Sequence, residues 1–360
     1  MLQTESQARA ESTTAARALH LEQLEVHLDL IYNWSYERQR QELRTLYDKA
    51  KRAQWIPDDV LPWQTDVDIS KPAGPPEFHP LHGSAILAKL TPQEATTLQA
   101  ELNAWTLSQF LHGEQGAMMA ATQLVAAVPD MESKYYAATQ VVDEARHVEV
   151  YDRYLHEKCR LVYPISPHLK KLLDLILTDS RWDMKLLGMQ IMVEGLALAA
   201  FGMIRQNTTE PLLKQLTHYV MLDEARHVAF GVLSLRDYYA DQKESDVKER
   251  EDFVYEAAVL MRDRFLFQQV WEKMGMPIEE CVKLALDNAG QKMFRSYLFA
   301  KIVPAVKRIG LLSNRQRERF EKLGILQFEH APDPFQDLAL AEAEQANQSR
   351  ELRRRGSDPS

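Results

Sequence analysis

The pentapeptide Asp143-Glu144-Ala145-Arg146-His147 recurs unchanged as Asp223-Glu224-Ala225-Arg226-His227, eighty residues further along the chain. Chance repetition of a given pentapeptide in a chain of this length is expected on the order of once in 10⁴ sequences, so the repeat carries structural information. Two further glutamates, Glu114 and Glu194, keep the same offset of eighty. The chain therefore contains two equivalent half-sites, each with two carboxylates and one imidazole.

Each pentapeptide places a glutamate and a histidine three residues apart. On an α-helix, side chains at positions i and i+3 lie on one face, with Cβ atoms about 5–6 Å apart. Glu144 and His147 can therefore bind one metal ion from one helical face, and Glu224 and His227 can bind a second.

The spacing of the glutamates predicts two helical hairpins. The two glutamates of each half-site are thirty residues apart, and the midpoints fall at Pro129 and Thr209, both beside turn-forming residues. Such residues favour helix ends. An antiparallel hairpin returns both glutamates to the same height, about 22 Å from its turn. All six side chains can then meet at one level of a four-helix bundle.

Four carboxylates in a protein interior require compensating charge, because an uncompensated buried charge takes up a proton or must be coordinated. Two divalent ions balance four carboxylates. Oxygen and imidazole ligands without thiolate suit iron or manganese. The sequence thus predicts a site for two iron ions, with a manganese–iron pair as the alternative. The predicted metal-binding and catalytic residues are Glu114, Glu144, His147, Glu194, Glu224 and His227.

The alternative interpretation, that both Glu-x-x-His pairs lie on ordinary solvent-facing helices, must account for the apolar residues beside them. A carboxylate framed by apolar residues is poorly placed for a surface, so the metal site is favoured. The flanking residues are Val141, Val142, Val148, Met221, Leu222 and Val228.

One Glu from each of two helices, with a Glu-x-x-His from each of two others, resembles the ferritin-like di-iron carboxylate superfamily. The Asp-Glu-x-Arg-His form is similar to that of bacterial multicomponent monooxygenases and related di-iron oxygenases. The resemblance implies an all-α fold, a ferritin-like four-helix bundle with additional flanking helices. It also implies that Asp143 and Asp223 accept the free imidazole N–H of a ligand histidine, on their own helix or across the bundle. Arg146 and Arg226 would hold those aspartates.

A weaker likeness lies upstream of the repeats. Residues 47–51 (YDKAK), followed by residues 55–57 (WIP), are similar to the entry segment of ribonucleotide reductase small subunits and their ligand-binding oxidase relatives. Tyr151 lies one turn after His147, where those reductase subunits place a radical-bearing tyrosine. Its repeat counterpart is Gly231, and a buried tyrosine that fills space is the commoner case.

The resemblance implies a non-haem di-iron oxidase or oxygenase, an O2-dependent enzyme that oxidises a small apolar or amphipathic substrate. Hydroxylation, N-oxygenation, desaturation and oxidative cleavage all stay open. The expected partners are the small-molecule substrate and an electron donor such as a reductase or ferredoxin, and a homodimer is one assembly the resemblance allows. The alternatives are a ferroxidase or iron-handling protein and a tyrosyl-radical-generating reductase-like subunit.

Two departures limit what can be transferred from the superfamily. Related hydroxylases and desaturases place a threonine within about one turn after the third carboxylate, whereas Ala197 and Leu198 follow Glu194. Arylamine N-oxygenases of this superfamily add a third histidine four residues before the last Glu. That position is Val220 here, so a seven-ligand centre is not expected.

Room for a substrate is predicted beside the ligands. Gly113 and Gly195 each adjoin a ligand glutamate and leave space near the metals. Apolar residues on the same helices could line a pocket, although plain core packing is the commoner role for methionine. These residues are Ala117, Met118, Met119, Ala121, Met189, Met192, Ala197, Phe201 and Met203.

Composition narrows the cellular setting. A net charge of −9 argues against nucleic acid or an anionic membrane as a partner. Cys159 and Cys281 are far apart and outside any metal-binding pattern, and the first twenty residues lack an apolar stretch, so a cytoplasmic protein is expected. The most apolar run, residues 188–204, is interrupted by Glu194 and is judged too short to span a membrane.

The pattern of prolines and apolar residues predicts one enlarged ferritin-like domain over residues 21–340, with its bundle core at 91–240. Residues 1–20 and 341–360 are expected to be disordered. Residues 91–94 (TPQE) predict a capping box at the start of the first bundle helix. Residues 56–84 should be an irregular wrapping segment. Helices are expected at 20–52, 92–128, 131–159, 168–178, 181–206, 211–239, 247–275 and 278–309.

Overall fold

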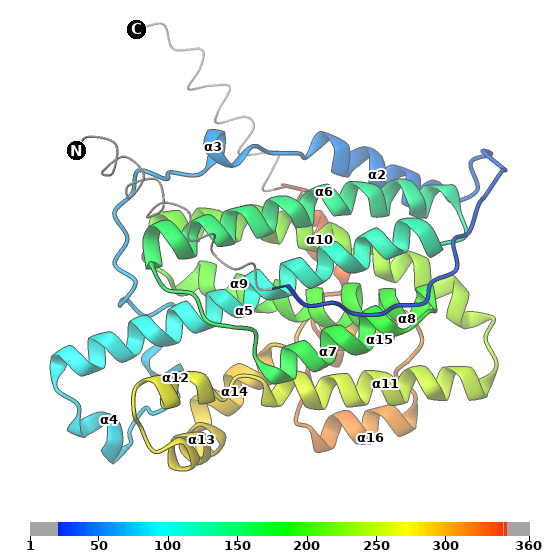
Figure 1. The fold of residues 1–360 in the computed structure, drawn as a ribbon. Coiled ribbons are helices and arrows are strands. Elements are labelled where there is room, and N and C mark those ends of the chain that lie inside the picture. The colour runs from blue at the N-terminus through cyan, green and yellow to red at the C-terminus, as the bar shows by residue number, and fades with distance from the viewer. Residues whose placement is uncertain (1–20, 341, 344–360) are drawn as a thin grey trace, which may run out of the picture.

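The computed structural model describes residues 21–340 and 342–343, and every regular element in these residues is helical. Four long helices form an antiparallel bundle at the centre of the molecule (Figure 1). The predicted all-α bundle is confirmed. Its helices are α5 (Pro92–Ala127), α6 (Met131–Arg153), the continuous helix α8–η3–α9 (Trp182–Asn207) and α10 (Pro211–Ala240).

The bundle helices begin where the sequence predicts them. Thr91 caps α5 through the expected capping box: its hydroxyl accepts from the Glu94 N–H, and the Glu94 carboxylate accepts from the Thr91 N–H at 2.8 Å. Asp130 accepts from a backbone N–H of α6, and Glu210 accepts from two of α10. These caps satisfy N–H groups that lack partners in the first turn. Both predicted hairpin corners are therefore present.

The third bundle helix contains a wide turn that the sequence did not reveal. α8 (Trp182–Leu186) leads into the π-helical segment η3 (Leu187–Val193), and α9 (Glu194–Asn207) follows directly. A π turn holds an extra residue and rotates the side chains that follow it. Because Glu194 comes immediately after η3, the wide turn helps to set the direction of its carboxylate. A second π segment, η2 (Tyr154–Cys159), ends α6.

By length and composition, the helix from Trp182 to Asn207 is apolar enough to cross a membrane, with a mean hydropathy of 1.7 in its most apolar window. The sequence-based judgement, made on residues 188–204 alone, understated its length. Other parts of the protein bury 83% of that window. Its apolar character is therefore accounted for by its place inside the bundle.

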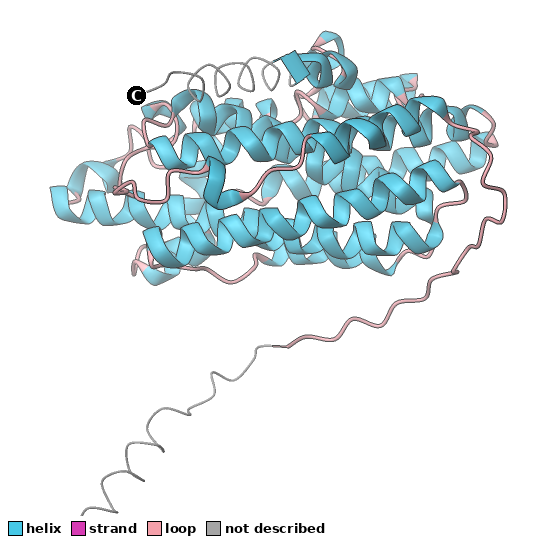
Figure 2. Ribbon diagram, turned by 90° about the horizontal axis from the view of Figure 1, so that it is seen from above, coloured by secondary structure: helices cyan, strands magenta, loops and turns pink. Residues whose placement is uncertain are grey.

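Shorter helices surround the bundle (Figures 1 and 2). Helix α7 (Pro167–Thr178) packs closely against the bundle. A Cβ added at Gly116 of α5 would lie 2.6 Å from Leu173 of α7, and one added at Gly188 of η3 would lie 2.5 Å from Ile176 of α7. The surrounding elements before the bundle's second half are α2 (Gln41–Arg52), α3 (Pro57–Val60), η1 (Pro76–Phe78), α4 (Ala85–Lys89) and α7 (Pro167–Thr178). Those after it are α11 (Glu244–Asp263), α12 (Gln268–Lys273), α13 (Ile278–Asp287), α14 (Ala289–Tyr297), α15 (Ile302–Arg308), α16 (Asn314–Lys322) and η4 (Leu326–His330).

The two long helices predicted over residues 247–275 and 278–309 are wrong. The first is broken between α11 and α12, where Phe267 takes a left-handed backbone conformation with φ of 56°. The second is divided at Asn288, whose side chain accepts from the Gln291 N–H and starts a new helix. Both breaks let the chain turn back over the end of the bundle.

The helix predicted over residues 20–52 is correct only for α2. Residues 21–39 run outside the helices as an extended segment (Figure 2). The N–H of Ile31 donates to Ala126 O at 3.0 Å, and the Asn33 amide donates to Pro129 O at 2.9 Å. Tyr32 and Trp34 stay mostly exposed. An amphipathic helix needs a surface on which to bury its apolar face, and this segment finds none.

The other segment predictions have mixed outcomes. Residues 56–84 form the predicted wrapping segment, with only α3 and η1 as regular turns. The predicted disordered residues 1–20 lie outside the described residues, as does most of the predicted tail, of which residues 342–343 are helical. Buried side chains from Leu43 to Leu338 form one large hydrophobic core, beside which Leu198, Ala225 and Val228 form a small second cluster.

A buried lysine gives the fold a pH-dependent stability. Lys185 of α8 is 0% exposed, and its Nζ donates to Gln123 Oε1 at 2.5 Å and to Leu177 O at 3.0 Å, near the end of α7. Burial lowers the pKa of Lys185 to about 8. Between pH 8 and about 10.5 the unfolded chain therefore binds a proton at this position that the folded chain does not, so stability rises with pH in this window.

Replacing Lys185 with methionine is expected to remove that rise. The free energy of unfolding of the wild type should gain roughly 1–3 kcal/mol, relative to the variant, between pH 7.5 and 10.5. Urea titrations of both proteins across this range measure the difference. Parallel stability profiles would show that Lys185 does not lose its proton in this window.

Candidate metal centre

The six predicted ligand side chains converge inside the bundle, although they come from four different helices. All are at most 5% exposed. Their candidate ligand atoms form two overlapping groups, each within 4.8 Å: one contains Glu114, Glu144, His147 and Glu224, and the other contains Glu144, Glu194, Glu224 and His227. Glu144 and Glu224 belong to both groups, so they lie between the two half-sites.

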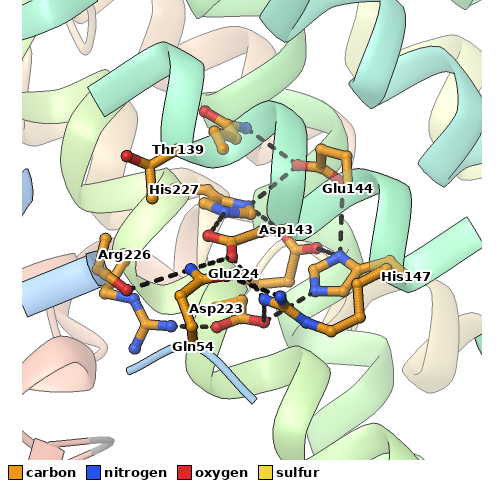
Figure 3. A network of polar contacts seen from close by, with 12 residues as sticks. Gln54, Thr139, Asp143, Glu144, His147, Asp223, Glu224, Arg226 and His227 are labelled. Atoms are coloured by element: carbon orange, nitrogen blue, oxygen red, sulfur yellow. Dashed lines mark hydrogen bonds and ion pairs between the residues drawn. The ribbon is translucent and has the colours of Figure 1, made fainter. Parts of the chain in front are cut away.

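Both imidazoles present Nδ1 to the carboxylates (Figure 3). His147 Nδ1 lies 3.3 Å from Glu114 and 3.4 Å from both Glu144 and Glu224. His227 Nδ1 lies 3.1 Å from Glu144 and 3.4 Å from Glu224, with Glu194 at 4.0 Å. Nδ1 is therefore the imidazole atom available to a metal ion in each half-site.

The opposite nitrogen of each imidazole contacts an aspartate of the other repeat. His147 Nε2 lies 3.1 Å from Asp223, and His227 Nε2 lies 3.3 Å from Asp143. The sequence left open whether these contacts form within a helix or across the bundle, and the structure shows that they cross. A carboxylate that accepts from Nε2–H fixes the tautomer and leaves the Nδ1 lone pair free for a metal.

Arginines and two further residues hold the aspartates. Arg146 donates to Asp143 at 2.5 Å and to Asp223 at 3.1 Å, and Arg226 donates to Asp223. Trp55 Nε1 donates to Asp223 at 2.8 Å. Gln54 donates to Asp143 at 2.7 Å (Figure 3). Trp55 lies in the segment that resembles the entry segment of ribonucleotide reductase small subunits. No sequence pattern had indicated that Gln54 contacts the site.

The protein alone leaves this cluster short of positive charge. Burial, together with the charges of Glu224 and Glu144, raises the pKa of Glu114 to about 8, although His147 opposes the rise. Burial and the charge of Glu224 also raise the pKa of Glu194 well above its usual value. One oxygen of each of Glu144, Glu194 and Glu224, and Nδ1 of His227, is buried without a hydrogen-bond partner. These atoms fit two divalent cations, which would supply the missing charge and bind the unpaired atoms.

Comparison with known proteins agrees with this geometry. A sequence model of the family described as P-aminobenzoate N-oxygenase AurF matches residues 37–310, more than half of the chain. The chain belongs to the AurF family. Family membership confirms the predicted class, an O2-dependent oxidoreductase of the di-iron type. No curated protein is a significant match to the sequence.

Solved structures confirm the ferritin-like fold. An R2-like ligand-binding oxidase with an aerobically reconstituted Mn/Fe cofactor is 19% identical to the AurF-family chain, with a TM-score of 0.50. A second R2-like ligand-binding oxidase, with a metal cofactor after photoconversion, is 18% identical with the same TM-score. Each alignment covers 75% of this chain and 93% of the other. The manganese–iron pair, predicted as the alternative to two iron ions, is the metal content named for the first structure.

The site has valine at the position where arylamine N-oxygenases have a third histidine, and it has a buried glutamine at the equivalent position of the first repeat. Val220 is wholly buried at the position of the third histidine. Its repeat counterpart, Gln140, donates to Glu144 at 3.0 Å and to Glu194 at 2.8 Å, and accepts from Gln190 at 3.3 Å. Gly231 makes room for this amide pair, because a Cβ there would lie 2.7 Å from Gln190. Sequence reasoning missed Gln140, although the eighty-residue offset that relates it to Val220 could have identified it.

Tyr151 lies in the apolar surroundings of the site. It is 0% exposed, its ring lies 5.8 Å from that of Phe201 and 6.1 Å from that of Phe110, and its hydroxyl has no hydrogen-bond partner. Burial raises the pKa of Tyr151 well above its usual value, and the charges of Glu114 and Glu224 add to the rise. The tyrosine therefore stays protonated.

A small void adjoins the carboxylates. It has a volume of about 20 Å³ and is lined by Glu114, Glu194 and Glu224, with Gly113 beside them. A Cβ at Gly113 would meet nothing within 4 Å, which agrees with the predicted room there. The same prediction for Gly195 is wrong, because Ile302 fills that space at 3.1 Å.

A larger apolar cavity, of about 320 Å³, lies further along α5 and α9. Of the residues predicted to line a pocket, Met203 lines this cavity, and Ala117 and Ala197 line the small void. Met189 and Met192 are wholly buried core residues, and Met119 is about half exposed. The cavity is within the range of small-molecule sites, about 300–1,000 Å³.

Proposed function

We propose that this AurF-family protein binds two iron ions through Glu114, Glu144, His147, Glu194, Glu224 and His227, and uses O2 to oxidise a small organic substrate. A manganese–iron pair is the alternative metal content. The observation that carries the proposal is the convergence of these six buried side chains, with unpaired ligand atoms facing one another and with each histidine oriented by an aspartate of the opposite repeat.

In the proposed reaction, the protein positions the metal ligands and keeps water away from the metal centre. Bound metals would supply the electrons that reduce O2 and would hold it beside the substrate. Asp143 and Asp223 hold the imidazoles in one tautomer, and Gln140 keeps the carboxylates of Glu144 and Glu194 in place by donating to both. The apolar helices around the cluster exclude water, which would otherwise compete in the reaction.

The proposed substrate site is the large apolar cavity together with the small void. The cavity is lined by Leu102, Leu107 and Phe110 of α5 and by Ala200 and Met203 of α9. An apolar or amphipathic molecule suits such walls. Of the four reactions that the sequence left open, the family description favours N-oxygenation. The valine at position 220 makes this ligand set differ from the seven-ligand arrangement expected of arylamine N-oxygenases.

Electrons for the metals must come from a donor, for which we propose a separate reductase or ferredoxin. A homodimer is proposed as the assembly. We also propose that the protein acts in the cytoplasm, where its two free buried cysteines, Cys159 and Cys281, would stay reduced.

One observation favours a second candidate, a tyrosyl-radical-generating protein. Tyr151 is buried close to Glu114 and Glu224 with its hydroxyl unpaired, a position that could protect an oxidised ring. A sharp tyrosyl signal in electron paramagnetic resonance, after the iron-loaded protein meets oxygen, would support that role. Its absence, together with oxidation of a substrate, would support the oxygenase.

Metal analysis tests the proposed function directly. Purified protein loaded anaerobically with ferrous iron should contain two metal ions per chain and should consume O2 when a reductant and an oxidisable substrate are added. Mass spectrometry of molecules retained by the native protein would then identify the substrate. A chain that binds fewer than two metals under saturating conditions would contradict the proposal.

A further inference from the structure

The large cavity runs lengthwise through the bundle, away from the metal ligands. Phe110 of α5 lines both the cavity and the small void, so the near end of the cavity adjoins the ligand carboxylates. Along α9, the void-lining residues end at Ala197, and the cavity-lining residues run from Ala200 to the corner that joins α9 to α10. At a rise of 1.5 Å per residue, that corner lies about 20 Å along the helix from Glu194. The cavity therefore has a remote end at the corner.

The remote end contains a buried acid, Glu210, which is 7% exposed and lines the cavity. Its Oε1 accepts from the Leu212 N–H at 2.8 Å. Its Oε2 accepts from the Leu213 N–H at 2.5 Å and from the Tyr154 hydroxyl at 3.0 Å. Backbone N–H groups at a helix N-terminus stabilise the charge of a carboxylate. Because an ionised carboxylate can accept about four hydrogen bonds, Glu210 can accept another from a ligand.

Glu210 is the one buried charged side chain among the described residues that line the cavity. Tyr154 and Cys159 also line it and stay neutral, because burial, reinforced by the charge of Glu210, raises the pKa of both groups, that of Cys159 to about 12. Burial lowers the pKa of His79 to about 4, so its imidazole is neutral near pH 7. The other ionisable residues of the lining are exposed to solvent, which screens their charges. They are Asp68, Lys71 and His82.

A ligand in the cavity therefore meets one fixed negative charge in apolar surroundings. Electrostatic interactions are stronger in such surroundings than in water. A cation, or a neutral N–H or O–H donor, would be stabilised next to Glu210. A carboxylate placed there would be repelled.

We propose that Glu210 binds the remote end of the substrate, and that this end carries an ammonium or another hydrogen-bond donor. The inference rests on the proposed function, since it names the substrate class of the same site. The donor is a second polar group, separate from the atom that is oxidised, so the assignment is compatible with N-oxygenation at the near end. Glu210 is thus a specificity-determining residue, and the apolar body of the substrate lies between it and Phe110.

Three probes with the same octyl chain test the proposal. Calorimetry on the metal-loaded full chain, without oxygen, would measure the binding of octan-1-amine, octan-1-ol and octanoate. The amine is protonated at pH 7, as a lysine side chain is. The Glu210→Gln variant should bind the ammonium about tenfold or more weakly than the wild type, because a hydrogen bond between two charged groups is lost. Its affinity for octanol should change far less, and its affinity for octanoate should not fall.

Two further variants separate the charge of Glu210 from its structural role. Tyr154→Phe keeps the carboxylate and removes one donor to it, so this variant should bind the ammonium at least as tightly as the wild type. The matched control is Asp130→Asn. Asp130 caps α6 as Glu210 caps α10, but it does not line the cavity. That variant should keep the wild-type affinity for all three probes.

Unchanged ammonium affinity in Glu210→Gln would overturn the inference, and so would an equal loss in Asp130→Asn. If Glu210→Gln does not fold, weaker ammonium binding by Tyr154→Phe than by the wild type would overturn it instead. Metal content, measured on the same preparations, reports separately on the proposed function. Two bound metals without the loss of ammonium binding would reject only the role of Glu210. Fewer than two metals, with that loss present, would contradict only the proposed metal centre.

Discussion

Replacing Glu144 with alanine should remove at least one of the two metal ions and nearly all O2-dependent activity. Glu144 contributes to both groups of candidate ligand atoms, so its loss weakens both half-sites together. It also accepts from Gln140 and faces both imidazoles. A loss of several kcal/mol of transition-state stabilisation would lower the rate on the order of 10³-fold. Elemental analysis and oxygen uptake measure the two effects.

Glu149→Ala is the matched control for this experiment. Glu149 lies on the same helix, is exposed and is not part of the carboxylate cluster. That variant should keep two metals and wild-type oxygen uptake. Full metal content in the Glu144→Ala protein would exclude Glu144 from the metal centre and would reopen the assignment of the other five ligands.

Replacing Asp223 with alanine should have the second largest effect, on stability as well as on metal binding. Asp223 is 0% exposed and accepts from His147, Arg146, Arg226 and Trp55. Its removal leaves two buried arginines without one of their carboxylates, a change that costs about 3–5 kcal/mol. Loss of the contact that orients a ligand histidine weakens metal affinity by about 10–100-fold. Denaturant titration and competition with a chelator measure these quantities.

Asp183→Ala separates the two effects of the Asp223 substitution. Asp183 is equally buried, and it pairs with Arg250 at 3.0 Å, away from the metal ligands. Both variants should be less stable than the wild type, but only Asp223→Ala should release metal to a chelator more readily. Equal metal affinity in the two variants would mean that Asp223 serves the fold alone.

The sequence alone was sufficient to predict the side chains of the site that recur in the two repeats. Glu-x-x-His at helical spacing, and an offset of eighty residues, predict which side chains converge whatever the detailed packing, because a helix repeats every 3.6 residues. Proline and capping residues predicted the ends of the bundle helices for the same reason: these signals act within one or two turns. The helix prediction failed for residues 21–39. Their amphipathic pattern alone does not produce a helix, because the segment has no surface against which to bury an apolar face.

The six converging side chains, the bundle and its two hairpins could thus be predicted from the chain alone, since each follows from spacing along the helices. The crossed pairing of Asp143 and Asp223, the contacts of the Gln140 amide with Glu194 and Gln190, and the π turn before Glu194 depend on which helices meet and at what rotation. Tertiary structure decided these features, because contacts between residues 50 to 84 positions apart are fixed by the packing of whole helices and leave no periodic signal in the sequence.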